Sequence, residues 1–170
     1  MAAMTNDLDA PAQIGRMAAS AATIATLRAA IRAGEPWPAG PVSGDGPEAE
    51  WGPPEVLAHT SEMLQYWLGE IERVVAGSPE PVPFGRVATD PLRTLTIERD
   101  RALPTGELIS RIQSSVVRYA ARLPELTTAD WHKRGLHPRL GEMTVEAMLQ
   151  RFVVSHLEEH AIQLRAALAS

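Results

Sequence analysis

The feature that most constrains the fold is a recurrence of apolar residues at steps of three and four along the chain. Four segments show it, over residues 12–33, 53–76, 105–123 and 144–170. Because an α-helix completes a turn in about 3.6 residues, this spacing places the apolar side chains of each segment on one side of a helix. Helices that each bury one side pack together as a bundle. We therefore predict an all-α fold, a four-helix bundle with long connecting loops.

The sequence also marks where these helices begin and end. Gly34 and Pro36 are expected to stop the first helix, and the prolines at 53–54 suit the first turn of the second. Thr105 and Thr144 are predicted to cap the third and fourth helices, because a threonine side chain can accept a hydrogen bond from the first free backbone N–H groups.

Each helix has a predicted core-facing side. In chain order these residues are Ile14, Met17, Ala21, Ile24, Arg28 and Ile31, then Val56, His59, Met63, Trp67, Ile71 and Val74, then Leu108, Ile112, Val116, Tyr119 and Leu123, then Val145, Leu149, Phe152, Val153, His156, His160 and Leu164.

Three long connections separate the helices. Residues 34–52 are dense in glycine and proline and are predicted to form a loop. Residues 77–104 are predicted to form a long crossover, in which R-T-L-T-I-E alternates like a short strand or extended segment. Residues 124–143 are expected to be irregular. The chain as a whole, 1–170, is predicted to be a single domain, with residues 1–11 as a flexible N-terminus.

The composition limits the partners, metal ligands and locations that we expect. A chain of 170 residues that is 45% hydrophobic can bury one core, and its formal charge of −5 does not favour nucleic acid or an anionic membrane as a partner. Cysteine is absent, so any metal would be held by nitrogen and oxygen ligands. Neither a signal peptide nor a membrane-spanning apolar run is evident. A cytoplasmic location is therefore expected.

Three of the five histidines fall on the predicted core-facing sides. His59 stands between hydrophobic residues of the second helix, and His156 and His160 lie four residues apart on the last. A buried imidazole is normally satisfied by a hydrogen bond or by a metal. Three of them on converging helices favour a divalent metal site with positions left open for other ligands. Histidines that are only hydrogen-bonded within the core remain the alternative.

Two other polar residues are candidates for catalytic support in the same site. Gln163 lies close to the histidine side of the last helix and is expected to hydrogen-bond a metal-bound water, and Glu159 could reach a metal, a ligand or a water. Glu158 is expected to point the opposite way, as a solvated charge. His132 and His137 are expected on the loop surface.

The run from His156 to His160 also matches H-x-x-E-H, a zinc-protease pattern in which the glutamate is the general base. That pattern needs a further carboxylate ligand far downstream. Only ten residues follow His160, so the protease interpretation fails.

Most of the chain, about 14–168, resembles the DinB/YfiT-like family. The resemblance rests on W-G-P-P-E-V-L-A-H-T, on A-D-W, and on S-H-L-E-E-H-A-I-Q-L. It implies a four-helix bundle in which His59, His156 and His160 bind a divalent metal, and Gln163 matches the family's H-x-x-x-H-x-x-Q ending.

The resemblance also implies a range of functions. Some members resemble S-transferases or isomerases that use a low-molecular-weight thiol, and members often pair as homodimers. We accordingly expect a metal-dependent enzyme, a thiol-dependent transferase or a hydrolase, that acts on a small-molecule substrate. Zinc or nickel is expected first, with iron or manganese next, and loops 34–52, 77–104 and 124–143 would shape the pocket. The alternative is a noncatalytic, stress-associated homodimeric bundle that binds a metal or ligand.

Overall fold

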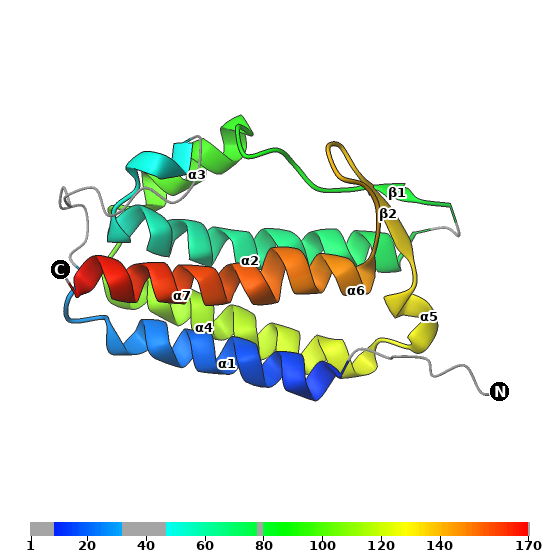
Figure 1. The fold of residues 1–170 in the computed structure, drawn as a ribbon, viewed down its shortest axis with the longest axis horizontal. Coiled ribbons are helices and arrows are strands. Elements are labelled where there is room, and N and C mark those ends of the chain that lie inside the picture. The colour runs from blue at the N-terminus through cyan, green and yellow to red at the C-terminus, as the bar shows by residue number, and fades with distance from the viewer. Residues whose placement is uncertain (1–8, 32–46, 78–79, 170) are drawn as a thin grey trace.

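The computed structural model describes residues 9–31, 47–77 and 80–169 (Figure 1). Four long helical stretches form the bundle: α1 (Ala10–Thr26), α2 (Pro53–Val75), α4 (Thr105–Arg122), and a last stretch made of α6 (Val145–Met148), a π-helical segment (Leu149–Val154) and α7 (Ser155–Leu168). The predicted all-α four-helix bundle is confirmed.

The order of the helices explains the long second connection. α1 and α2 each pack against both α4 and α7. In Figure 1, α2 and α4 both begin at the end of the bundle where the C-terminus lies, whereas α1 and α7 run the other way. Since α2 and α4 are parallel neighbours, the chain between them must return along the whole of α2, about 35 Å for 23 residues. The crossover predicted over 77–104 serves this purpose.

The crossover contains a helix where an extended segment was predicted. Residues Pro91–Asp100 form α3, which packs on α2. The alternation of Leu95 and Ile97 was misleading, because Ile97 is buried while Leu95 is exposed on the outer side of a helix. The overlooked signal was local: the Asp90 side chain accepts a hydrogen bond from the backbone N–H of Arg93, and Pro91 follows in the first turn.

A small sheet is a second departure from the prediction. Strand β1 (Val82–Pro83) pairs in parallel with β2 (Arg134–His137), and β2 pairs antiparallel with β3 (Gly141–Thr144). Residues 124–143, predicted to be irregular, thus contain a hairpin, a short helix α5 (Thr128–Trp131) and a 3-10 turn (Leu123–Glu125). Strands of two to four residues are too short to show a periodic pattern in sequence.

The predicted end of the first helix was wrong. α1 begins at Ala10, where the Asp9 side chain accepts from the N–H of Ala12, and it ends at Thr26 rather than near residue 33. The predicted stops at residues 34 and 36 lie outside the described residues, as do residues 1–8 of the predicted flexible N-terminus.

The predicted cap of the third helix was also wrong. α4 begins at Thr105, but the Thr105 hydroxyl donates to the backbone carbonyl of Ile31 at 2.9 Å and so ties α4 to the segment that follows α1.

Other boundary signals are confirmed. Pro53 begins α2, and Glu55 accepts from the backbone N–H of Gly52. Thr144 caps the last stretch by accepting from the N–H of Ala147. The expected core-facing residues of α2 and α4 are all buried. Arg28, placed on the core side of the first helix, is instead exposed, since it follows the end of α1.

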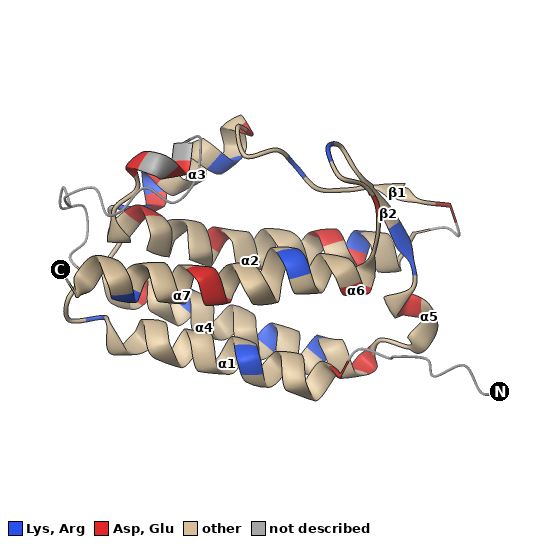
Figure 2. Ribbon diagram, in the orientation of Figure 1, with Lys and Arg blue, Asp and Glu red and all other residues tan. Residues whose placement is uncertain are grey.

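Charged residues of both signs are interspersed along the helices (Figure 2). Several join neighbouring helices, as Arg16 of α1 does with Glu158 of α7, and Arg122 of α4 with Glu72 of α2. Within the described residues, no helix has the length and apolar character that crossing a membrane requires.

Candidate metal centre

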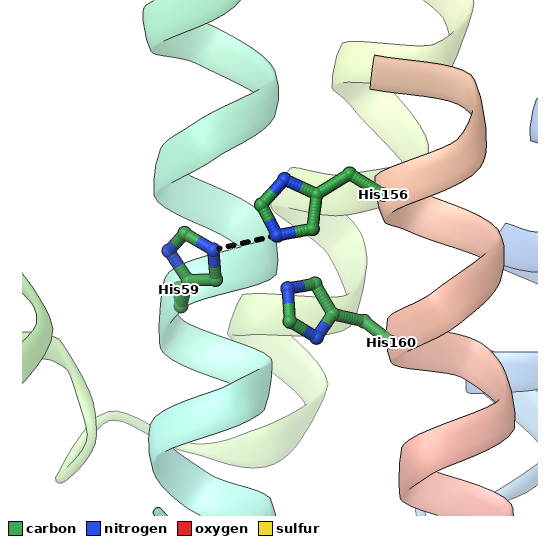
Figure 3. A group of neighbouring side chains, drawn as sticks. All are labelled: His59, His156 and His160. Carbon is green, nitrogen blue, oxygen red and sulfur yellow. Dashed lines mark hydrogen bonds between the residues drawn. The ribbon is translucent and has the colours of Figure 1, made fainter. Parts of the chain in front are cut away.

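Three histidines converge between α2 and α7 (Figure 3). His59 comes from α2, and His156 and His160 come from successive turns of α7. The Nε2 atoms of His59 and His156 are 3.4 Å apart. Each of the three residues has a ring nitrogen within 4.8 Å of one on both others. The structure thus brings together the three residues that the sequence predicted as metal ligands.

Burial keeps this group uncharged. His59 and His160 are buried, and His156 is half-buried. Desolvation lowers the pKa of His59 well below its usual value, and the neighbouring histidines and arginines lower it further. Burial likewise lowers the pKa of His160, and it lowers that of His156 to about 3. All three imidazoles are therefore neutral at pH 7, the form that can bind a metal.

One of the rings has a hydrogen-bond partner that fixes its orientation. Nδ1 of His160 donates to Oε1 of Gln163 at 2.9 Å. Histidine ligands in metal sites commonly donate their second N–H in this way. Gln163 therefore contacts His160 directly.

Buried polar atoms in the group fit a metal. Nε2 of His160 and Nδ1 of His59 are both buried without a hydrogen-bond partner. An unpaired buried nitrogen is costly, and a cation among the three rings would satisfy Nε2 of His160. The all-nitrogen donor set suits zinc, nickel, copper or iron. The three-histidine group could therefore hold a divalent ion.

One side of the group is covered by residues that the sequence analysis did not single out. The Trp51 ring lies 5.1 Å from that of His59, centroid to centroid, and the Arg93 guanidinium lies over the Trp51 ring at 5.0 Å. Arg93 is buried, donates to the backbone carbonyl of Ala88, and forms an ion pair with Glu48. Trp51 precedes α2, and Arg93 belongs to α3, a helix that the sequence did not predict, so only the tertiary structure could place this pair beside the histidines.

A second ion pair lies beside His59 on α2. Oε2 of Glu62 is 3.9 Å from Nδ1 of His59, and Glu62 is paired with Arg86. Residues three apart on a helix are neighbours, so the sequence did carry a signal for Glu62.

The remaining predicted residues have different surroundings. Glu159 is exposed on α7 and influences His160 through its charge. Glu158, expected to be a solvated charge, forms two hydrogen bonds of 2.7 Å with Arg16, so it links α7 to α1. His132 is exposed, as expected.

His137 is not on the loop surface. Its ring is buried and stacks on Phe152, with centroids 5.4 Å apart. Its Nδ1 accepts from the backbone N–H groups of Arg139 and Leu140, both at 3.2 Å. The correction has a structural cause: pairing of β2 with β3 forms a hairpin that folds over the bundle, and its turn is stabilised by this imidazole.

Comparison with known proteins supports the family suggested by the sequence. A search of curated proteins finds no match. A sequence model described as the DinB superfamily matches residues 18–164, a range that contains α2 and α4 entirely, most of α7, the second half of α1 and all three histidines. The chain therefore belongs to the DinB superfamily.

Proposed function

We propose that this chain is a divalent-metal-dependent enzyme acting on small molecules, with His59, His156 and His160 as the metal ligands. One observation carries the proposal: three neutral imidazoles from two helices present nitrogens within 4.8 Å of one another, and one of these nitrogens is buried and unpaired. Zinc or nickel would suit this donor set, with iron or manganese next.

The number of ligands favours catalysis over a structural role. Structural zinc sites usually have four protein ligands, whereas catalytic sites have three and keep a position open. When bound, a divalent ion lowers the pKa of a coordinated water or thiol. The chain has no cysteine, so a thiol would come from a diffusible cofactor. We accordingly propose a thiol-dependent transferase or a hydrolase.

The residues around the histidines have roles in this proposal. Gln163 orients His160 through Nδ1, which leaves Nε2 free to bind the metal. Trp51 and Arg93 cover His59 and limit the access of water. Trp51 also lines a pocket of about 440 Å³ together with Glu55 and Ile97. We propose that a small-molecule substrate enters from this side, where the crossover and the turn before α2 meet.

Metal analysis tests the ligand assignment. Protein purified without a histidine tag should contain about one divalent ion per chain, and His156→Ala/His160→Ala should contain none. Zinc at a hundred times its dissociation constant should stabilise the wild type by about 2.7 kcal/mol, which raises Tm by roughly 5 to 10 °C. The double variant should show no such shift. Equal occupancy in the two proteins would refute the assignment.

Turnover assays test the reaction class. The metal-loaded protein should consume a panel of electrophiles with mycothiol, bacillithiol or glutathione, or hydrolyse substrates without a thiol. Full metal occupancy with no turnover on either panel would instead favour the noncatalytic metal-binding bundle. The cytoplasmic location and the homodimer stay predictions from sequence, which cell fractionation and light scattering would test.

A further inference from the structure

A metal bound by the Nε2 atoms of the histidine group would still leave one buried ring nitrogen without a partner. Nδ1 of His59 is buried and forms no hydrogen bond, while its Nε2 faces His156. In contrast, Nδ1 of His160 donates to Oε1 of Gln163. If Nε2 of His59 binds a metal, its proton must be on Nδ1, and a buried donor there requires an acceptor.

The carboxylate of Glu62 lies beside this nitrogen. Its Oε2 lies 3.9 Å from Nδ1 of His59, one helical turn further along α2. A normal N–H···O hydrogen bond spans about 2.7 to 3.2 Å, so a movement of about 1 Å by the carboxylate would form one. A side chain of this length can make that movement without any change in the helix backbone.

Arg86 holds Glu62 in this place. Nη2 of Arg86 lies 2.6 Å from both carboxylate oxygens, and the two side chains are only 10% and 11% exposed. The guanidinium also stacks on Tyr66, 3.8 Å from the ring centroid. Glu62 is therefore a nearly buried carboxylate with a compensating charge, rather than an exposed surface acid. Its location next to an unpaired histidine nitrogen needs an explanation beyond stability.

We propose that Glu62 is a positioning residue for the metal: it accepts the Nδ1–H of His59 and so directs Nε2 toward the ion. The inference rests on the proposed function, since it concerns a bound metal. A carboxylate acceptor makes the imidazole a more basic ligand, and Arg86 keeps the carboxylate oriented. His59 thereby has the same kind of support that Gln163 gives to His160.

Glu62→Gln tests the inference, with Glu72→Gln as a control. Glu72 lies on the same helix and is likewise paired with an arginine, Arg122 of α4, but it is thirteen residues from His59. Zinc affinity measured by competition with a chelator should fall about 10- to 100-fold in Glu62→Gln and stay unchanged in the control. Glu62→Asp, which keeps the charge, should lose less than Glu62→Gln.

A second test uses the wild-type protein, so it does not require that a variant folds. Nitrogen-15 NMR of the zinc-loaded protein should show His59 protonated at Nδ1 and metal-bound at Nε2. Binding through Nδ1 would overturn the inference, as would unchanged affinity in Glu62→Gln while His59→Ala loses the metal. If His59→Ala itself keeps full affinity, the ligand assignment fails and this inference with it.

Discussion

At the residue scale, the two nitrogens of His160 have opposite surroundings. Nδ1 is bonded to Gln163, whereas Nε2 is buried without a partner. The tautomer is thereby fixed, because an amide oxygen can only accept. The histidine pattern in the sequence identified three candidate ligands, but the tautomer depends on where Gln163 lies one turn further along α7.

Gln163→Ala tests this orienting role. The substitution removes the acceptor for Nδ1–H of His160 and should weaken zinc binding by about 10-fold, since partners of metal-binding histidines typically contribute that much. Stability of the metal-free protein should change little, because Gln163 is only half-buried. Chelator competition measures the first effect and thermal melting the second. Unchanged zinc affinity would show that His160 needs no orienting partner.

At the scale of elements, the short helix α5 depends on its cap. Asp130 accepts hydrogen bonds from the backbone and hydroxyl of Thr127, whose side chain accepts in turn from the N–H of Asp130. Lys133 adds an ion pair at 3.1 Å. These contacts lower the pKa of Asp130 to about 2, and the Thr127 hydrogen bond contributes most. The A-D-W segment noted in the sequence thus has a structural role.

This capping carboxylate should make stability depend on pH. Because its folded pKa is depressed, the stabilisation is complete above the unfolded value near 3.9 and is lost as pH falls through about 2. Between pH 4 and pH 2, the free energy of unfolding should therefore fall by roughly 1 to 2 kcal/mol less in Asp130→Asn than in the wild type. Urea unfolding across this range measures the difference. If the unfolding free energies of the two proteins changed with pH in the same way, the pKa of Asp130 would not be depressed in the folded state.

The length of an element decided whether the local sequence pattern predicted it. The repeating pattern of α2 and α4 spans five turns or more, and the helices appear as predicted. α3 and the hairpin of β2 and β3 are short: α3 packs on α2, and the hairpin is held by its own strand pairing and by β1. A segment of four to ten residues contains too few repeats for its period to be read, so capping residues such as Asp90 carry most of the signal.

At the scale of the whole molecule, stability comes from the buried sides of the four helices. α4 contributes none of the three histidines, so substitutions in this helix measure the effect of packing alone. Ile112 is completely buried on this helix, while Val117 is 67% exposed. Ile112→Ala should cost about 2 to 5 kcal/mol of unfolding free energy, through lost burial and a cavity.

Val117→Ala is the matched control, since it truncates a side chain of the same class on the same helix. Its effect should lie within about 0.5 kcal/mol of zero. Both values come from chemical denaturation of metal-free protein. Equal losses for the two variants would mean that the exposed side of α4 is covered in solution, as in a homodimer.

The sequence by itself determined the four helices, the sides that they bury and the position of the three histidines on those sides, because the period of an α-helix sets the side of the helix on which each residue lies. It could not determine which helices are neighbours, since periodicity gives a direction around each axis but no partner. The antiparallel and parallel arrangement of α1, α2, α4 and α7 brings His59 to the last helix and makes the long crossover necessary. The crossover between α2 and α4 also brings Arg93 over Trp51 and Arg86 to Glu62, beside the three histidines, because these two contacts join segments far apart in the chain.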